Sequence, residues 1–248
     1  MNTIASETLL PWLAIAGVFV LAGTVKGITG MGLPTVAMSL LALWMAPSQA
    51  AALLVVPSLM TNAMQCIGPA WKRLAAGLWP LWLGLAATTL AAPDLRALGP
   101  VDPGLALGVV LIAYGAWGLW KPVLPALSPR NAWIGLVVGL MTGFVTASTA
   151  VFVLPLVPYL QALKLDKATM IQALGLSFTV ATLTLAARLH AVGGGGVEVG
   201  SSLVALAAAT AGLAVGAALR IGLSAETFQR SLFVVFIALG AVNAWRAL

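Results

Sequence analysis

The feature that most constrains this chain is its succession of ten apolar stretches, separated by short polar or glycine- and proline-containing breaks. They cover roughly 9–25, 35–46, 49–67, 77–92, 104–120, 132–145, 150–163, 168–187, 199–219 and 229–245. A transmembrane helix needs about 20 predominantly apolar residues, and only 7% of this chain is charged, against about 25% in soluble domains. The sequence therefore predicts an all-α integral membrane protein, a polytopic helix bundle forming one membrane domain over residues 1–248.

Charge and composition exclude several other classes of function. The net charge is +6, but the Lys and Arg residues are scattered across short breaks, which is typical of topology signals and not of nucleic-acid binding. The single cysteine, Cys66, permits neither an internal disulfide nor a cysteine-based metal cluster. All six carboxylates lie at termini, breaks or segment edges, so no buried acid is evident for a cation or proton relay. We expect no enzymatic activity, no catalytic residues, no metal and no cofactor.

Two breaks interrupt the apolar sequence where a helix would otherwise continue, at Gly27–Pro34 and at Thr142–Thr149. Non-helical backbone inside a bilayer leaves amide and carbonyl groups without partners, at a cost of several kcal/mol each unless protein, water or ligand satisfies them. Such breaks tend to line cavities. We therefore expect each half of the chain to open with a broken or re-entrant helix pair.

The two halves resemble each other in sequence. LGVVLIAYGAWGLWK (107–121) and LFVVFIALGAVNAWR (232–246) share eight of 15 residues. Upstream, an offset of 116 residues pairs Gly23 with Gly139 and Thr61 with Ser177. We expect two internal repeats, over about 9–121 and about 131–248. Because each repeat holds an odd number of segments, the second enters the membrane from the opposite face, which is the inverted design of many secondary transporters.

The positive charges favour one orientation of this arrangement. If all ten segments alternate in direction, eight Lys and Arg residues fall on one side and three on the other, which favours a cytoplasmic location for the first side. If each broken pair crosses only once, the count without Lys26 is six against five, and the charges give almost no preference. The eight are Lys72, Arg73, Lys121, Arg130, Lys164, Lys167, Arg220 and Arg230. The three are Arg96, Arg188 and Arg246.

The first break carries the residues that point most directly to a binding site. Lys26 is a lone cation within apolar sequence, and Gly27, Thr29, Gly30 and Gly32 follow it. Helix N-termini that begin after glycines direct free N–H groups at an anion, and lysine supplies a full charge. The alternative is that Lys26 reaches an interface while the glycines serve helix packing.

The second break replaces glycines with hydroxyls. Its polar residues are Thr142, Thr146, Ser148 and Thr149. Hydroxyl groups suit the acceptor oxygens of an oxyanion, although Ser and Thr in membrane helices also bond back to the preceding turn. Because the breaks match in the repeat, we expect them to form one pocket near the midplane. Three further residues, expected to face that pocket, are Thr61, Asn62 and Ser177. The other polar residues within the segments are typical of helix–helix contacts: Ser58, Gln65, Gln172, Thr179, Thr182 and Thr184.

At these residues the chain resembles the sulfite exporter TauE/SafE family. The resemblance rests on Gly23-x-x-x-Gly27-x-x-Gly30-x-Gly32, on the degenerate copy that begins at Gly139, and on Pro155. It covers nearly the whole chain. It implies a bacterial multi-pass permease of the inner membrane that moves sulfite, sulfonates or related sulfur-containing organic anions.

The sequence therefore predicts a secondary transporter that moves a small anion by alternating access, with the anion and the lipid bilayer as partners and no nucleic acid. An anion channel with the same pocket is one alternative, and a non-transporting membrane subunit that assembles other components is another. The small residues of Gly212-x-x-x-Gly216 allow either a homodimer or packing within the chain.

Overall fold

The computed structural model describes residues 2–93, 102–120, 122, 124–128, 131–193, 199–220 and 225–247. For residues 2–9 and 225 the description covers the helical backbone alone. Ten α-helices form over these residues. They are α1 (Asn2–Thr29), α2 (Leu33–Leu41), α3 (Pro47–Cys66), α4 (Trp71–Ala91), α6 (Pro103–Trp120), α7 (Ala132–Thr149), α8 (Leu156–Ala162), α9 (Lys167–Ala191), α10 (Val199–Leu219) and α11 (Ala225–Arg246). The predicted all-α polytopic bundle is thus confirmed.

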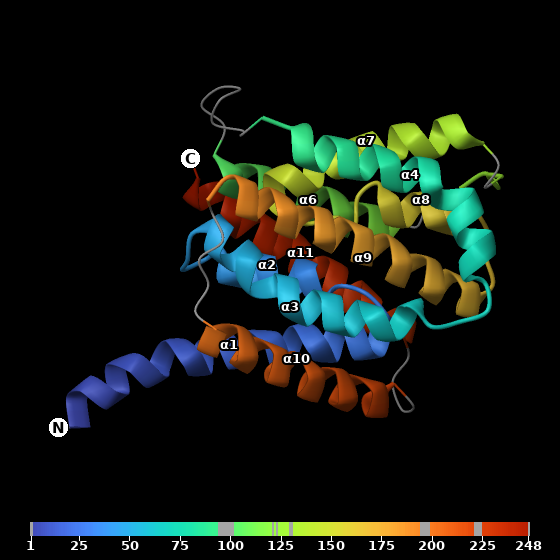
Figure 1. The fold of residues 1–248 in the computed structure, drawn as a ribbon. Coiled ribbons are helices and arrows are strands. Elements are labelled where there is room, and N and C mark those ends of the chain that lie inside the picture. Colours follow the sequence, from blue (N-terminus) through green and yellow to red (C-terminus); the bar gives the residue numbers. More distant parts are fainter. Residues whose placement is uncertain are drawn as a thin grey trace.

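The helices run close to one common axis, so the bundle has two ends (Figure 1). Helix α1 begins and α11 finishes at the same end, called here the terminal end; the other is called the opposite end. Seven of the helices are long and apolar enough to cross a membrane. Helices α2 and α8, with nine and seven residues, are too short to cross alone.

The first predicted break is present, whereas the second was predicted too early: residues 142–149 are helical and form the end of α7, and the break follows at 150–155. Between α1 and α2, Gly30 (φ 82°) and Gly32 (φ 101°) adopt left-handed conformations that glycine accommodates without a steric penalty. Between α7 and α8, residues 150–155 leave the helix and α8 begins at Leu156. Each half therefore opens with a long helix followed, after a short break, by a short one.

Glycines hold two pairs of helices at close range. In the pair α1 and α10, a Cβ added to Gly23 would lie 2.2 Å from the carbonyl oxygen of Ala209, and one added to Gly212 would lie 2.1 Å from that of Val20. In the pair α4 and α7, a Cβ at Gly139 would lie 2.1 Å from the carbonyl oxygen of Leu81. Because the Gly212 face packs against α1, these small residues serve contacts within the chain.

The remaining contacts place matching helices of the two halves together. Helix α3 packs on α9 and α6 packs on α11, while α4 also contacts α9 and α10 also contacts α3. Figure 1 shows that α1 and α7 run in opposite directions, as do α3 and α9.

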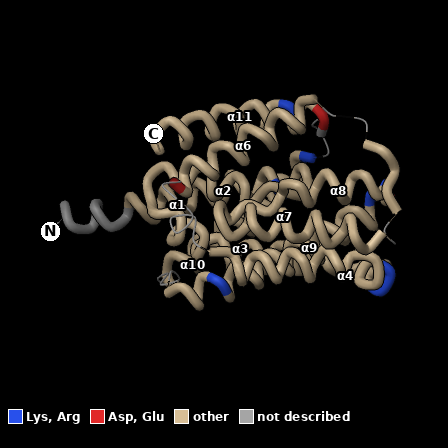
Figure 2. Tube along the Cα trace, turned by 90° about the horizontal axis from the view of Figure 1, so that it is seen from above, with Lys and Arg blue, Asp and Glu red and all other residues tan. Residues whose placement is uncertain are grey.

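The charged residues lie mainly at the two ends of the bundle (Figure 2). Among the described residues, six cations belong to segments at the opposite end: Lys72, Arg73, Lys164, Lys167, Arg220 and Arg230. Arg188 and Arg246 belong to the helix ends at the terminal end. Lys121, Arg130 and Arg96 lie outside the described residues.

The close approach of α1 and α10 makes a stability prediction. We expect Gly23→Ala to destabilise the protein by about 1–3 kcal/mol, because the added methyl group meets backbone and not a side chain that could move. The matched control is Gly17→Ala in the same helix, where no atom lies within 4 Å of the added Cβ. Thermal unfolding in detergent measures both, and equal midpoints for the two variants would contradict the prediction.

Candidate anion-binding site

Lys26 lies near the end of α1 and is almost completely buried, with 2% of its surface exposed. Its Nζ donates hydrogen bonds to Thr61 Oγ1, at 3.0 Å, and to Asn62 Oδ1, both on α3. Among the described residues, no carboxylate lies within ion-pair distance of this amine. The structure therefore holds a buried basic group on neutral polar partners alone.

Four polar side chains of α3 line up beside this amine. Ser58, Thr61, Asn62 and Gln65 follow the i, i+3, i+4, i+7 spacing that places residues on one helix face. We call these four residues together with Lys26 the Lys26 cluster. The Thr61 hydroxyl donates to the carbonyl of Pro57 at 2.7 Å, so its oxygen is available to accept from Lys26.

The Lys26 cluster contains buried polar atoms without a hydrogen-bond partner. They are Ser58 Oγ, Asn62 Nδ2 and Gln65 Oε1. A buried polar group without a partner costs about 1–3 kcal/mol. Two of these groups, the Ser58 hydroxyl and the Asn62 amide, are able to donate a hydrogen bond. Together with Lys26 they could supply donors to the oxygens of an anion.

The first break is braced by the residues around it. Gln65 Nε2 donates to the carbonyl of Gly30 at 2.6 Å, which ties the break to the Lys26 cluster. The Thr29 hydroxyl bonds to the carbonyls of Val25 and Met31, at 2.9 and 2.7 Å. Gly27 faces α10, where an added Cβ would lie 2.5 Å from the carbonyl oxygen of Leu213. The Thr29 hydroxyl therefore stabilises the backbone of the break, and Gly27 allows the close contact between α1 and α10. Gly32 precedes the first turn of α2.

The hydroxyls of the predicted second break lie in α7 and bond back to their own helix. Thr142, Thr146, Ser148 and Thr149 each lie 2.7 to 2.8 Å from the carbonyl oxygen four residues earlier. Their protons are therefore already used. Ser177, further along the chain, accepts a hydrogen bond from Trp82 Nε1 at 2.9 Å.

The structure gives the second half no counterpart of the Lys26 cluster among its described residues. The repeat position of Asn62 is occupied by Phe178, whose ring packs 5.1 Å from that of Phe152. Aromatic carbon thus fills the place that polar atoms fill in the first half.

A cleft of about 470 Å³ opens at the terminal end of the bundle, among the start of α3 and the ends of α4, α7 and α9. We call it the Arg188 cleft. Thr146, Ser148 and Thr149 line it together with Arg188 and Ser48. The Arg188 guanidinium donates to the carbonyls that end α4, those of Thr89 at 3.1 Å and Ala92 at 2.6 Å. The second-break hydroxyls therefore lie on this cleft, and Lys26 does not line it.

A second cavity, of about 340 Å³, lies at the opposite end near the starts of α4 and α9. Its lining includes Arg73, Lys164 and Asp166. The side chain and the backbone N–H of Thr169 hydrogen-bond to the Asp166 carboxylate, and this holds the pKa of that carboxyl below its ordinary value. Each end of the bundle therefore has a cavity with basic side chains at its wall.

Sequence reasoning grouped Lys26 with Thr61 and Asn62 but left out Ser58 and Gln65, which it assigned to helix contacts. The spacing 58, 61, 62 and 65 was the signal that could have added them, because it marks one face of α3. Nothing in the sequence located the Arg188 cleft. Its wall joins segments more than 100 residues apart in the chain, including Ser48 and Arg188.

Comparison with known proteins gives one match. The family model described as sulfite exporter TauE/SafE matches residues 15–243. No curated protein and no solved structure matches the chain.

Proposed function

Because the chain belongs to the sulfite exporter TauE/SafE family and is therefore a membrane transporter of sulfur-containing anions, we propose that it carries sulfite or an organosulfonate through the Lys26 cluster. The proposed carrier resides in the bacterial inner membrane and works by alternating access. The observation that supports the site is the buried amine of Lys26, which meets only neutral polar groups of α3.

The charge of the site favours an anion as its ligand. Ionisable residues within membrane segments are expensive, and they commonly pair with an opposite charge or line a substrate path. Lys26 has no carboxylate partner among the described residues, so a bound anion supplies the missing charge. The Ser58 hydroxyl and the Asn62 amide then donate to oxygens of the same anion. A single cation matches one negative charge, as in a sulfonate or hydrogensulfite.

We propose further that the two halves are inverted repeats. The glycine contacts support this, because the same offsets recur on both sides of each pair. Gly23 faces Ala209 as Gly139 faces Leu81, and Gly212 faces Val20 as Gly84 faces Leu136. In every case the residues of α1 and α7 differ by 116, and those of α10 and α4 by 128. Helices α1 and α7 run in opposite directions, as expected if one half is inverted relative to the other. Such a pair of halves gives the two related conformations that alternating access needs.

The orientation of the proposed carrier follows from its charges. The six described cations at the opposite end outnumber the two at the terminal end, so the opposite end is assigned to the cytoplasm. The Arg188 cleft then faces the outside of the membrane.

Flux measurements in proteoliposomes test this function. We expect sulfite uptake that saturates with concentration and is accelerated when sulfite is loaded inside, because a carrier exchanges substrate across the membrane. Linear flux with single-channel currents would indicate the channel instead. Empty liposomes and liposomes with heat-inactivated protein are the controls. If neither flux nor current exceeds these controls for sulfite, methanesulfonate or taurine, the transport proposal is wrong and the assembly-subunit alternative gains support.

A further inference from the structure

We propose that the Arg188 cleft is the vestibule through which the anion reaches the Lys26 cluster, and that Met38 and Leu54 form the closed gate between them. This inference rests on the proposed function, since it supplies the route to the same site.

Helix α3 connects the cleft to the Lys26 cluster. Ala51 lines the cleft, and Leu54, Ser58 and Asn62 follow at spacings of three, four and four residues, which keeps all four on one face. At 1.5 Å of rise per residue, Ser58 lies about 10 Å and Asn62 about 16 Å beyond Ala51 along the helix. The cleft and the cluster are therefore separated by roughly two turns of one helix.

The two polar groups along this line lack partners. Both residues are 0% exposed, and Ser58 Oγ and Asn62 Nδ2 have no hydrogen-bond partner among the described residues. Structural polar side chains in a bundle normally find a bonding partner. Unpartnered donors that follow one helix face towards a buried amine fit a path that an anion occupies for part of a transport cycle.

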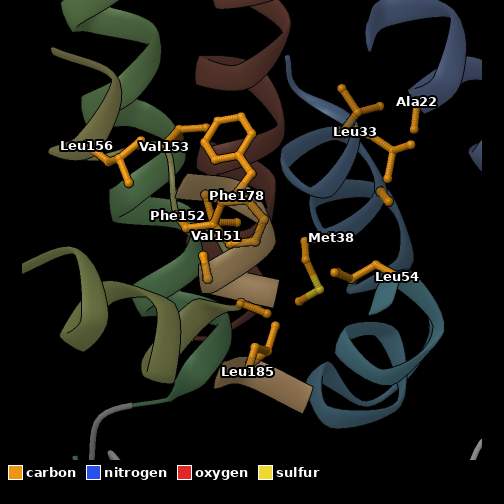
Figure 3. Close-up of a cluster of buried hydrophobic side chains, with 14 of the residues drawn as sticks. Ala22, Leu33, Met38, Leu54, Val151, Phe152, Val153, Leu156, Phe178 and Leu185 are labelled. Atoms are coloured by element: carbon orange, nitrogen blue, oxygen red, sulfur yellow. The ribbon is translucent and has the colours of Figure 1, made fainter. Parts of the chain in front are cut away.

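Two apolar side chains lie between the cleft and these unpartnered donors. Met38 of α2 lines the cleft, and its side chain is directed towards Leu54 of α3 (Figure 3). Met38 is 1% exposed and Leu54 is completely buried. Leu54 precedes Ser58 by one helical turn, so it lies directly before the first unpartnered donor on this face of α3. The short helix α2 follows the first break, so rearrangement there would move Met38 away from Leu54.

Arg188 gives the vestibule its preference for anions. The guanidinium belongs to the cleft wall and donates to carbonyl oxygens, and no carboxylate in the described part of the chain pairs with its charge. A cleft lined by positive charge raises the local concentration of anions.

Thiol labelling tests the gate and the vestibule. Cys66→Ser removes the native thiol, and Ser48→Cys or Ser58→Cys then places one thiol at the cleft wall or behind the gate. The probe is sulfonatoethyl methanethiosulfonate, an anion that does not cross the membrane, applied to the outside of intact spheroplasts. We expect rapid reaction at Ser48→Cys and slow reaction at Ser58→Cys. Adding Met38→Ala should raise the Ser58→Cys rate by at least about tenfold, the change that a barrier lower by ~1.4 kcal/mol produces.

The control for the gate is Met141→Ala, which removes the same side chain from a position that is 55% exposed. It should leave the Ser58→Cys rate unchanged. Leu54→Ala provides a second opening of the same contact if Met38→Ala does not fold. Methanesulfonate, which unlike sulfite does not react with the reagent, should slow reaction at Ser58→Cys and leave Ser48→Cys unaffected. Arg188→Gln should reduce the preference of Ser48→Cys for the anionic reagent over a cationic one of similar size, and Arg188→Lys should retain it.

Two results would overturn the inference. One is a folded gate variant whose Ser58→Cys rate equals that of the Met141→Ala control. The other is a Ser58→Cys thiol that methanesulfonate does not protect or that reacts only from the inner face. Sulfite exchange by the wild-type protein is measured separately. Exchange without a gate effect would reject only the gate, whereas a gate effect without any anion flux would reject the proposed function.

Discussion

Replacing Lys26 with Met is expected to abolish anion transport while the protein stays folded. Methionine fills a similar volume in this buried place but carries no charge and donates no hydrogen bond. A charge-assisted hydrogen bond contributes about 1.5–3 kcal/mol, so the dissociation constant for sulfite should rise about 10- to 150-fold at least. The thermal midpoint should change little, since the loss of two hydrogen bonds is offset by relief from burying a charge.

The matched control for this substitution is Lys72→Met. Lys72 lies in the first turn of α4, is exposed and has its Nζ 5.5 Å from the centre of the Trp71 ring. The substitution Lys72→Met removes the same charge as Lys26→Met, but at a distance from the Lys26 cluster. Sulfite counterflow and ligand-induced thermal stabilisation are measured on both variants. Wild-type flux in Lys26→Met would refute the assignment of the site.

Introducing a carboxylate beside Lys26 should have an equally large effect by a different route. In Asn62→Asp the new carboxylate takes the place of the amide that accepts the hydrogen bond from Lys26 Nζ, and it neutralises the amine. An anion bound about 4 Å from that carboxylate would meet a repulsion of about 4 kcal/mol at an effective dielectric constant of about 20. We therefore expect sulfite binding to fall below detection, with thermal stability maintained or raised.

Asn131→Asp is the control for this added charge. Asn131 is exposed and caps the start of α7, where its side-chain oxygen accepts from the N–H of Ile134. Aspartate caps a helix as well as asparagine does. This variant should bind sulfite as the wild type does. If titration calorimetry finds unchanged sulfite affinity in Asn62→Asp, the Lys26 cluster does not hold the anion.

Much of this fold was accessible from the sequence because breaks and apolar periodicity are local properties. Gly30 and Gly32 mark the end of α1, and the structure finds both in left-handed conformations there. The pairing of Thr61 with Ser177 in the repeat indicates the face of α3 on which the structure places Thr61 and Asn62. The contact of Lys26 with Thr61 and Asn62 followed, and the anion-binding role of these residues stays a prediction.

What could not be predicted depends on how distant segments meet. Whether the second-break hydroxyls donate to a ligand or to their own helix depends on rotamers, and the structure shows the bond to the preceding turn at Thr146 and Ser148. The Arg188 cleft requires α9 to reach the end of α4, a contact between residues separated by 95 to 99 positions in the chain. A repeat relates two positions of the chain, but the residues at those positions can differ in chemistry, as Asn62 and Phe178 do.

The glycine contacts also determine which parts of this protein can move as units. Helix α1 of the first half is locked to α10 of the second, and α7 of the second half is locked to α4 of the first. Each half of the chain therefore packs one of its helices against a helix of the other half. Separating the halves would leave the glycine faces of these helices without their partners. If the chain moves between two conformations, the closely packed pairs α1–α10 and α4–α7 are expected to move as units, so the moving bodies would not coincide with the proposed repeats.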